Sequence, residues 1–176
     1  MRQAELAILD GTQALRCGPL DWLMPFVSSL SNHGEIWVLF AALLLLLRRQ
    51  RRYGVSAACA LALDLAACNM ILKPLIGRVR PFVFRPDLPL LVPPPGDASF
   101  PSGHTAAAFA VVFALKTAGS PLWRPALALA VVTAFSRLYL YVHWPTDILG
   151  GVLLGAAVGW AGAKLAEALL RKQKQT

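Results

Sequence analysis

The run Ile36-Trp-Val-Leu-Phe-Ala-Ala-Leu-Leu-Leu-Leu-Leu47 is entirely apolar and is followed at once by Arg48-Arg-Gln-Arg-Arg52. An apolar helix that ends in clustered arginine is typical of a membrane span that reaches the cytoplasmic surface. Comparable apolar runs recur along the chain, and we predict spans at about 29–47, 53–71, 102–117, 125–141 and 145–170. The sequence therefore predicts an all-α fold, a polytopic membrane bundle of about five transmembrane helices.

The composition also favours a membrane protein. Of 176 residues, 57% are apolar and only 15% are charged, whereas about a quarter of the residues of a soluble domain are charged. The net charge of +8 could indicate nucleic-acid binding, but the basic residues lie in short clusters between apolar runs. No nucleic-acid partner is therefore expected. The three cysteines, Cys17, Cys59 and Cys68, have neither a disulfide pattern nor a metal-binding spacing.

Basic residues also predict the orientation of the spans. Because successive spans alternate in direction, the cluster Arg48–Arg52, the connection near residue 120 and the basic C-terminus share one face. By the positive-inside rule this face is cytoplasmic. The opposite, extracytoplasmic face carries Lys73, Arg78, Arg80 and Arg85, with Arg137 near it.

Three polar stretches lie where predicted spans meet the extracytoplasmic face. They are Lys73-Pro-Leu-Ile-Gly-Arg-Val-Arg80-Pro81, Pro101-Ser-Gly-His104, and Ser136-Arg137 with His143 and Asp147. A compact bundle brings such helix ends together, so we expect them to form one site. Cations at this depth are costly unless an anion accompanies them.

The expected anion is a phosphate group. The planar fork of arginine suits phosphate, and the start of the third span adds backbone N–H groups and the positive end of a helix dipole. The predicted phosphate-binding residues are Lys73, Arg80, Ser102, Gly103 and Arg137. We interpret Arg78 and Arg85 as snorkelling anchors at the membrane surface instead.

Two histidines accompany this predicted anion site. His143 precedes Asp147 by four positions, which fits a nucleophilic imidazole oriented by a carboxylate. His104 is then left to protonate the leaving oxygen as a general acid, so the predicted catalytic residues are His143, His104 and Asp147. Asp147 is the only carboxylate in the three stretches, and the neighbouring cations would repel a metal ion. Neither a metal nor another cofactor is expected.

The three stretches resemble the signature motifs of the type 2 phosphatidic acid phosphatase (PAP2) family, which includes bacterial polyprenyl-diphosphate phosphatases and vanadium haloperoxidases. The defining positions are matched by Lys73, Arg80 and Pro81, by Pro101 to His104, and by Ser136, Arg137, His143 and Asp147. The resemblance implies a PAP2-like fold and a metal-independent phosphatase in which His143 forms a phosphohistidine that water hydrolyses. Larger bacterial members have six spans, and we expect the first to be missing here.

With this resemblance we divide the chain into three parts. Residues 1–28 are expected to form an interfacial amphipathic segment, because Ala4, Ala7, Ile8, Gly11 and Leu15 repeat at a helical spacing. Residues 29–170 form the PAP2-like transmembrane catalytic domain, and residues 171–176 form a basic cytoplasmic tail.

Two further features of the predicted catalytic domain were considered. The proline-rich segment from Pro74 to Pro101 is expected to contain no helix. Its apolar part, within Phe82–Phe100, is either a guide for a lipid tail or a stiff connector. Small residues at every fourth position favour close helix packing within the chain, with a homodimer through the same face as the alternative. They are Gly151, Gly155 and Gly159.

The leading predicted function is a lipid phosphatase of the inner or plasma membrane that converts undecaprenyl or another polyprenyl diphosphate to the monophosphate. Phosphatidic acid and phosphatidylglycerol phosphate are the alternative substrates. A haloperoxidase is disfavoured, because that branch of the family is typically soluble and larger. A non-catalytic lipid-phosphate-binding protein is disfavoured too, because binding alone requires neither both histidines nor Asp147.

Overall fold

The computed structural model describes residues 2–32 and 34–172, and every regular element in that part of the chain is helical. This confirms the predicted all-α fold. The elements η1 and η2 are a π-helix and a 3₁₀-helix. In chain order the elements are α1 (Arg2–Gln13), α2 (Gly18–Ser29), α3 (Glu35–Leu46), α4 (Arg51–Asp64), η1 (Leu65–Leu72), α5 (Lys73–Ile76), η2 (Pro81–Phe84), α6 (Gly103–Thr117), α7 (Trp123–Tyr139) and α8 (Pro145–Lys172).

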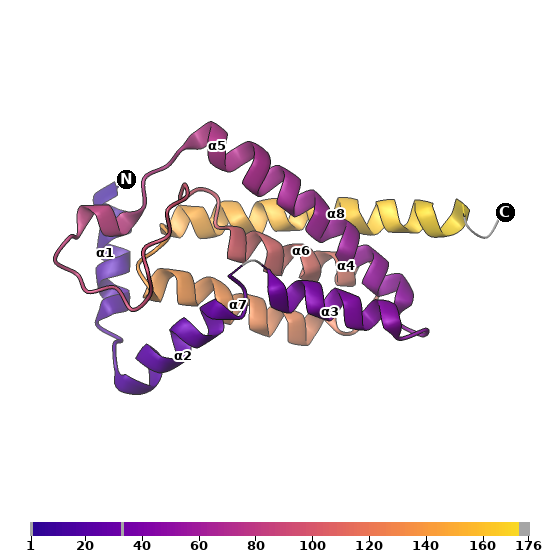
Figure 1. Cartoon of the computed structure of the whole chain (residues 1–176), viewed down its shortest axis with the longest axis horizontal. Coiled ribbons are helices and arrows are strands. Elements are labelled where there is room, and N and C mark those ends of the chain that lie inside the picture. The colour runs from indigo at the N-terminus through magenta and orange to yellow at the C-terminus, as the bar shows by residue number, and fades with distance from the viewer. Residues whose placement is uncertain (1, 33, 173–176) are drawn as a thin grey trace.

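The helix α6 lies at the centre of the bundle and contacts α4, α7 and α8 (Figure 1). On α8, an added Cβ at Gly155 would lie 2.7 Å from the Ala106 carbonyl oxygen, and one at Gly159 would lie 2.5 Å from that of Ala110. These distances leave no room for a side chain. The glycine stripe, which begins with Gly151, therefore packs against α6 of the same chain, and a homodimer would have to use another surface.

Two helical segments are long and apolar enough to cross a membrane, Arg51–Phe84 and Pro145–Lys172, and α3 is a shorter apolar helix. Large apolar side chains project outward from all three segments. Leu46 is 81% exposed, Met70 72% and Leu153 63%. An outer surface of this kind suits hydrocarbon better than water.

The first predicted span begins later than expected. The helix α2 ends at Ser29, and α3 begins at Glu35 directly after Gly34, whose φ is +78°. A left-handed residue interrupts a right-handed helix, and glycine adopts this conformation without the clash of a Cβ. The two helices are therefore separated by a turn.

The proline-rich segment is partly helical, so the expectation that it contains no helix is wrong. The short helix α5 includes Pro74 in its first turn and follows the π-helix η1 directly. Proline is tolerated in a first turn, and the wider winding of a π-helix replaces the ordinary hydrogen bonds just before it. Pro81 likewise begins the 3₁₀-helix η2. The rest of the segment is irregular and consists of residues 77–80 and a longer loop, residues 85–101, that runs close to α1 (Figure 1).

The N-terminal helix α1 leaves the predicted apolar stripe exposed and packs against the bundle through a neighbouring face. Ile8 and Leu15 are 53% and 52% exposed, whereas Glu5, Leu9 and Thr12 are buried. The buried stripe contacts α7 and α8. The helical spacing was visible in the sequence, but it did not indicate that Glu5 would be buried between α1 and the bundle.

The two ends of the bundle differ in chemistry. The turn between α3 and α4 and the C-terminal end of α8 lie at one end (Figure 1), and this end carries the clustered arginines of the sequence. At the other end, α1, α2 and the loop of residues 85–101 lie around the start of α8 (Figure 1). His143 lies at this second end, two positions before the first residue of α8.

Candidate active site

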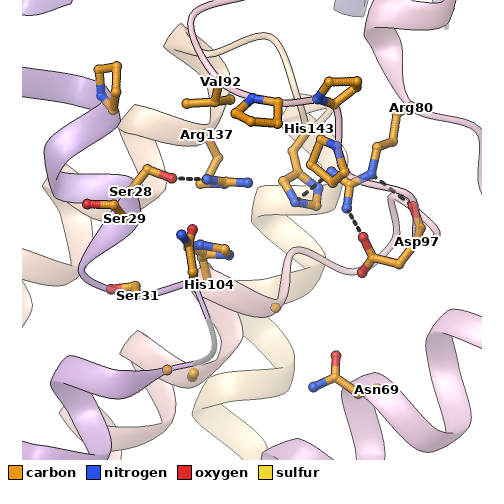
Figure 2. Close-up of a pocket in the computed structure, with 18 of the residues that line it drawn as sticks. Ser28, Ser29, Ser31, Asn69, Arg80, Val92, Asp97, His104, Arg137 and His143 are labelled. Carbon is orange, nitrogen blue, oxygen red and sulfur yellow. Dashed lines mark hydrogen bonds and ion pairs between the residues drawn. The ribbon is translucent and has the colours of Figure 1, made fainter. Parts of the chain in front are cut away.

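The three predicted stretches meet at one cavity of about 1210 Å³. Figure 2 shows that Arg137 and His143 point into a common space from one side, with His104 close to Arg137. The predicted site residues that line the cavity are Lys73, Arg80, Gly103, His104, Arg137 and His143. Ser102 and Asp147 do not line it, although the Ser102 N–H donates to the Asp147 carbonyl oxygen at 3.1 Å. The structure therefore brings both imidazoles to one cavity.

A tight turn places His143 between α7 and α8. Tyr141 has a φ of +60°, which is uncommon for a residue with a side chain. Its hydroxyl donates to Asp10 of α1 at 2.6 Å, and the Val142 N–H donates back to the Arg137 carbonyl at 3.2 Å. These bonds fix the turn and leave His143 only 1% exposed.

His143 has a different partner at each ring nitrogen. Arg80 Nη1 lies 3.3 Å from Nε2, and Asp147 Oδ2 lies 3.5 Å from Nδ1, which is longer than an ordinary hydrogen bond. A guanidinium group can only donate, so Nε2 carries the lone pair and Nδ1 carries the proton. This is the tautomer that a nucleophilic imidazole requires, with the carboxylate behind it.

The surroundings of His143 also keep its ring neutral. Burial, together with the charges of Arg137 and Arg80, outweighs the opposing effect of Asp147 and lowers the pKa of His143 to about 3. At neutral pH the imidazole is therefore uncharged. Its Nε2 lone pair faces Arg80 Nη1.

Arg137 is a buried cation that retains a free donor. It is 4% exposed, its Nη1 donates to Ser28 Oγ of α2, and its Nε has no hydrogen-bond partner among residues 2–32 and 34–172. Nε2 of His104 is buried in the same cavity and is also unbonded within that part of the chain. A buried guanidinium is stable only when its charge and donors are matched. The cavity is therefore suited to an anion.

Lys73 and Arg80 already hold a carboxylate that sequence analysis missed. Arg80 Nη2 donates to Asp97 Oδ1 at 2.7 Å, Arg80 Nε donates to the Asp97 carbonyl oxygen at 2.9 Å, and Lys73 Nζ donates to Asp97 Oδ2 (Figure 2 shows the Arg80 contacts). Arg80 Nη1 also donates to the Val142 carbonyl oxygen at 2.7 Å. Nothing in the sequence marks Asp97, because it lies in the proline-rich loop outside the three motifs.

The start of α6 faces the same space as Lys73. A Cβ added at Gly103 would lie 3.7 Å from Lys73 Nζ, so the first turn of the helix and the ammonium group are close. First-turn N–H groups lack partners within a helix and attract anions. Ser102 has a different place from the one predicted, because its Oγ accepts a hydrogen bond from Thr105 at 3.0 Å and is fully buried. Ser102 thus joins α6 to α8 rather than facing the cavity.

Asp147 is fully buried in the first turn of α8 and accepts several hydrogen bonds. Its Oδ2 accepts from the Ser99 hydroxyl and from the Trp144 N–H at 2.9 Å, and its Oδ1 accepts from Arg78 Nη1. Arg78 also forms an ion pair with Glu5 of α1 at 2.8 Å. The interpretation of Arg78 as a snorkelling anchor is therefore wrong, because its guanidinium binds two buried carboxylates.

The loop of residues 85–101 forms one wall of the cavity. Leu91, Val92 and residues 93–95 line it from this loop. On the loop's outer part, Arg85 forms an ion pair with Asp10 of α1 at 2.8 Å, and both side chains are nearly half exposed. Other apolar residues that line the cavity come from the helices and include Trp22, Phe26, Val38, Leu61 and Leu65. The cavity thus has a cationic part beside the histidines and an apolar part.

The arrangement can bind and attack a phosphate group. It offers an imidazole lone pair, a second imidazole, three cations and a helix N-terminus around one space, as phosphoryl transfer requires. No group of three His, Cys, Asp or Glu side chains in the described part of the chain is arranged to hold a metal ion.

Comparisons with known proteins point in the same direction. The sequence model of the PAP2 superfamily matches residues 53–171. The chain is 31% identical over 147 residues to an undecaprenyl-diphosphatase of Sulfolobus acidocaldarius, with 83% of this chain and 70% of that protein covered. It is 38% identical over 153 residues to a decaprenylphosphoryl-5-phosphoribose phosphatase of Mycolicibacterium smegmatis, with 85% and 82% covered. The crystal structure of a transmembrane PAP2 type phosphatidylglycerolphosphate phosphatase from Bacillus subtilis matches it with a TM-score of 0.72 and 28% identity, with 97% and 86% covered.

Proposed function

This chain belongs to the PAP2 superfamily and is a phosphatase of that family, and from that premise we propose that it removes the terminal phosphate of a membrane lipid through a phosphohistidine at His143. The substrate that we propose is a polyprenyl diphosphate, which would be hydrolysed to the monophosphate. The observation that carries the proposal is the buried Arg137, which lines the cavity shared by His143 and His104 and whose Nε has no hydrogen-bond partner in the described part of the chain.

Substrate binding uses the cationic part of the cavity. The phosphate oxygens are held by Lys73, Arg80, Arg137 and the first-turn N–H groups of α6. The phosphate competes with Asp97 for Lys73 and Arg80, whose contacts with that carboxylate occupy the same cavity. When Arg80 turns toward the phosphate, it also releases Nε2 of His143.

The chemistry then proceeds in two displacements. The bound phosphate anion offsets the neighbouring cations, so His104 is protonated in the substrate complex. Nε2 of His143 attacks phosphorus while the bond to the leaving oxygen breaks, and His104 transfers its proton to that oxygen. Asp147 stabilises the positive charge that develops on the imidazole. In the second step His104 takes a proton from water, the water oxygen attacks phosphorus, and the P–N bond breaks. Inorganic phosphate leaves, and His143 is restored.

The apolar part of the cavity supports a lipid as the substrate. Phe26 of α2, Val38 of α3 and Leu65 of η1 line the same cavity as the cations. A phosphate at the histidines would therefore have its hydrocarbon chain directed along an apolar surface. Phosphatidylglycerol phosphate is the second candidate, and it is favoured by the likeness in fold to the Bacillus enzyme.

We further propose that five helical segments cross the inner or plasma membrane: α3, α4 with η1 and α5, α6, α7 and α8. The clustered arginines at one end support a cytoplasmic location for that end, which places the site on the extracytoplasmic side. Cys17 is exposed between α1 and α2, at the site end. A membrane-impermeant maleimide should label Cys17 in intact cells, and in a Cys17→Ser background it should not label an Arg49→Cys variant. The reverse pattern would contradict the orientation.

The substrate and the role of Arg137 can be tested together. Purified protein is assayed with undecaprenyl diphosphate, phosphatidylglycerol phosphate and phosphatidic acid, and we expect the highest kcat/KM for the polyprenyl diphosphate. Arg137→Ala should lower kcat about 100-fold, which is typical when one donor to the transition state is removed. Arg124→Ala, at the opposite end of the same helix, is the matched control and should keep its activity. Equal losses in the two variants would contradict the proposed site.

A further inference from the structure

We propose that Glu5 and Arg78 are positioning residues, through which the N-terminal helix α1 holds the carboxylate of Asp147 in place behind His143. The inference rests on the proposed roles of His143 and Asp147. It assigns to α1 a function in turnover. Glu5 lies outside the three sequence motifs, because several helices separate α1 from the first motif at Lys73.

Arg78 connects the two carboxylates directly. Its Nη1 donates to Asp147 Oδ1 and, at 2.7 Å, to Thr146 Oγ1, and its Nη2 donates to Glu5 Oε2 at 2.8 Å. Its guanidinium carbon also lies 5.2 Å from the centre of the Trp144 ring. A planar guanidinium with partners on two sides and a ring nearby has little freedom to turn.

Arg78 fixes the direction in which the Asp147 carboxylate faces. The two oxygens of Asp147 have separate partners, because Arg78 binds Oδ1 whereas Ser99 and the Trp144 N–H bind Oδ2. Oδ2 is also the oxygen that lies 3.5 Å from Nδ1 of His143. Without Arg78 the carboxylate would be held through Oδ2 alone, so it could tilt about its Cβ–Cγ bond and shift Oδ2 relative to Nδ1 of His143.

Glu5 holds Arg78 from the side of α1. Its side chain is buried, with Oε2 bound by Arg78 and Oε1 accepting from the Thr146 N–H at 3.2 Å and from the Thr146 hydroxyl at 2.6 Å. Thr146 lies in the first turn of α8, directly before Asp147. Glu5 therefore ties α1 to both the helix that carries Asp147 and the arginine that orients it.

The apolar neighbour of Glu5 makes the same connection. Leu9, one turn further along α1, has no exposed surface and packs with Tyr141 and Trp144, which lie on either side of His143 in the sequence. A helix that buries a carboxylate while leaving Ile8 53% exposed is not docked by hydrophobic burial alone. The contact is specific to the turn that carries the nucleophile.

The first test is Arg78→Ala in the full-length protein, assayed with a lipid phosphate in detergent micelles. Misplacement of a reacting group by about 1 Å can cost about 100-fold in rate, so we expect kcat to fall about 100-fold while KM changes less than about threefold. Guanidinium ion, below the concentration that unfolds the protein, should restore part of kcat. Thermal unfolding of each variant shows whether it is folded, and Arg78→Lys supplies a milder variant if the alanine form is unstable.

The second test is a double-mutant cycle with Glu5→Gln. In the wild-type background this change should lower kcat, whereas in the Arg78→Ala background it should have no further effect, because Glu5 acts through Arg78. Arg85→Ala is the matched control. It breaks an ion pair between α1 and the loop at Asp10 but touches neither Asp147 nor Glu5, so it should keep its kcat and show no response to guanidinium.

Assaying His143→Asn in parallel distinguishes a failure of the positioning role from a failure of the proposed function. If Arg78→Ala keeps its kcat while His143→Asn is inactive, the positioning role is overturned and the proposed function stands. If His143→Asn keeps its turnover, the proposed function itself fails. An equal loss in Arg78→Ala and Arg85→Ala, without rescue by guanidinium, would show that α1 only stabilises the fold, and it would also overturn the positioning role.

Discussion

Neutralising Asp97 should tighten the binding of phosphate at the site. This carboxylate binds both Lys73 and Arg80. The other donors of Arg80 also have partners, so few of them are available to an incoming anion. Arg80 Nε and Nη1 donate to the carbonyl oxygens of Asp97 and Val142, and Nη1 also lies against His143. A phosphate must therefore compete with Asp97 for the same donors. The isosteric change Asp97→Asn removes the competing charge and keeps the shape of the loop.

The size of the effect follows from how exposed the two ion pairs are. The Asp97 side chain is 52% exposed, whereas those of Lys73 and Arg80 are 13% and 5% exposed. Solvent screens half-exposed pairs, so the two together are expected to contribute about 1 kcal/mol. Such an energy corresponds to about a fivefold change in a binding constant. The inhibition constant of inorganic phosphate should therefore fall about fivefold in Asp97→Asn.

The effect should not depend on pH in the working range. Partial burial alone would raise the pKa of Asp97, but Lys73 and Arg80 outweigh it and lower that pKa from 3.8 to about 2. The folded pKa lies below the unfolded one, so the ion pairs are fully formed above about pH 4 and are lost only as the pH falls toward about 2. The fivefold difference should thus be the same at pH 5 and pH 8.

The assay is inhibition of lipid phosphate hydrolysis by inorganic phosphate and by orthovanadate, with wild-type and Asp97→Asn protein compared at two pH values. Asp87→Asn, in the same loop, is the matched control, because this carboxylate does not line the cavity. An inhibition constant that is unchanged or higher in Asp97→Asn would refute the reasoning. A difference that disappears at pH 5 would show that Asp97 is not held as a charged partner of the two cations.

Three further predictions follow from the structure. His104→Ala should lower kcat at least about 100-fold for a lipid phosphate but less for an aryl phosphate with a good leaving group, and equal losses would argue against the acid role. Gly155→Val should destabilise the protein by about 1–3 kcal/mol, because its Cβ would meet the Ala106 carbonyl oxygen at 2.7 Å. Gly11→Ala, which meets no atom within 4 Å, should leave the unfolding temperature unchanged or higher. Treatment with EDTA should leave kcat unchanged, and recovery by an added divalent ion after a loss would contradict a metal-independent mechanism.

The parts of the site that lie at helix ends could be predicted from the sequence. Each motif lies at the start or the end of an apolar run, and the alternating direction of the runs then brings Arg80, His104 and His143 to one end of the bundle. The residue types then predicted an anion-binding site, because cations beside hydrocarbon require an anionic partner. The helix α6 even begins within one residue of the predicted position.

The residues that the sequence did not reveal depend on contacts between distant segments. Glu5 lies on α1 outside the predicted apolar stripe, and Asp97 lies in a loop without a regular sequence pattern. The local sequence does not distinguish Arg78 from Arg85, yet Arg78 binds a buried carboxylate whereas Arg85 binds an exposed one. These contacts depend on how distant segments pack together, and a local sequence pattern does not contain that information.

The central claim is that His143 becomes phosphorylated during turnover, and trapping the intermediate tests it most directly. Protein that is turning over a lipid labelled in its terminal phosphate is quenched within milliseconds, digested and mapped. We predict label on the peptide that contains His143, and none in His143→Asn protein that is shown to be folded. Label on another residue, or undiminished hydrolysis by the His143→Asn variant, would contradict the account.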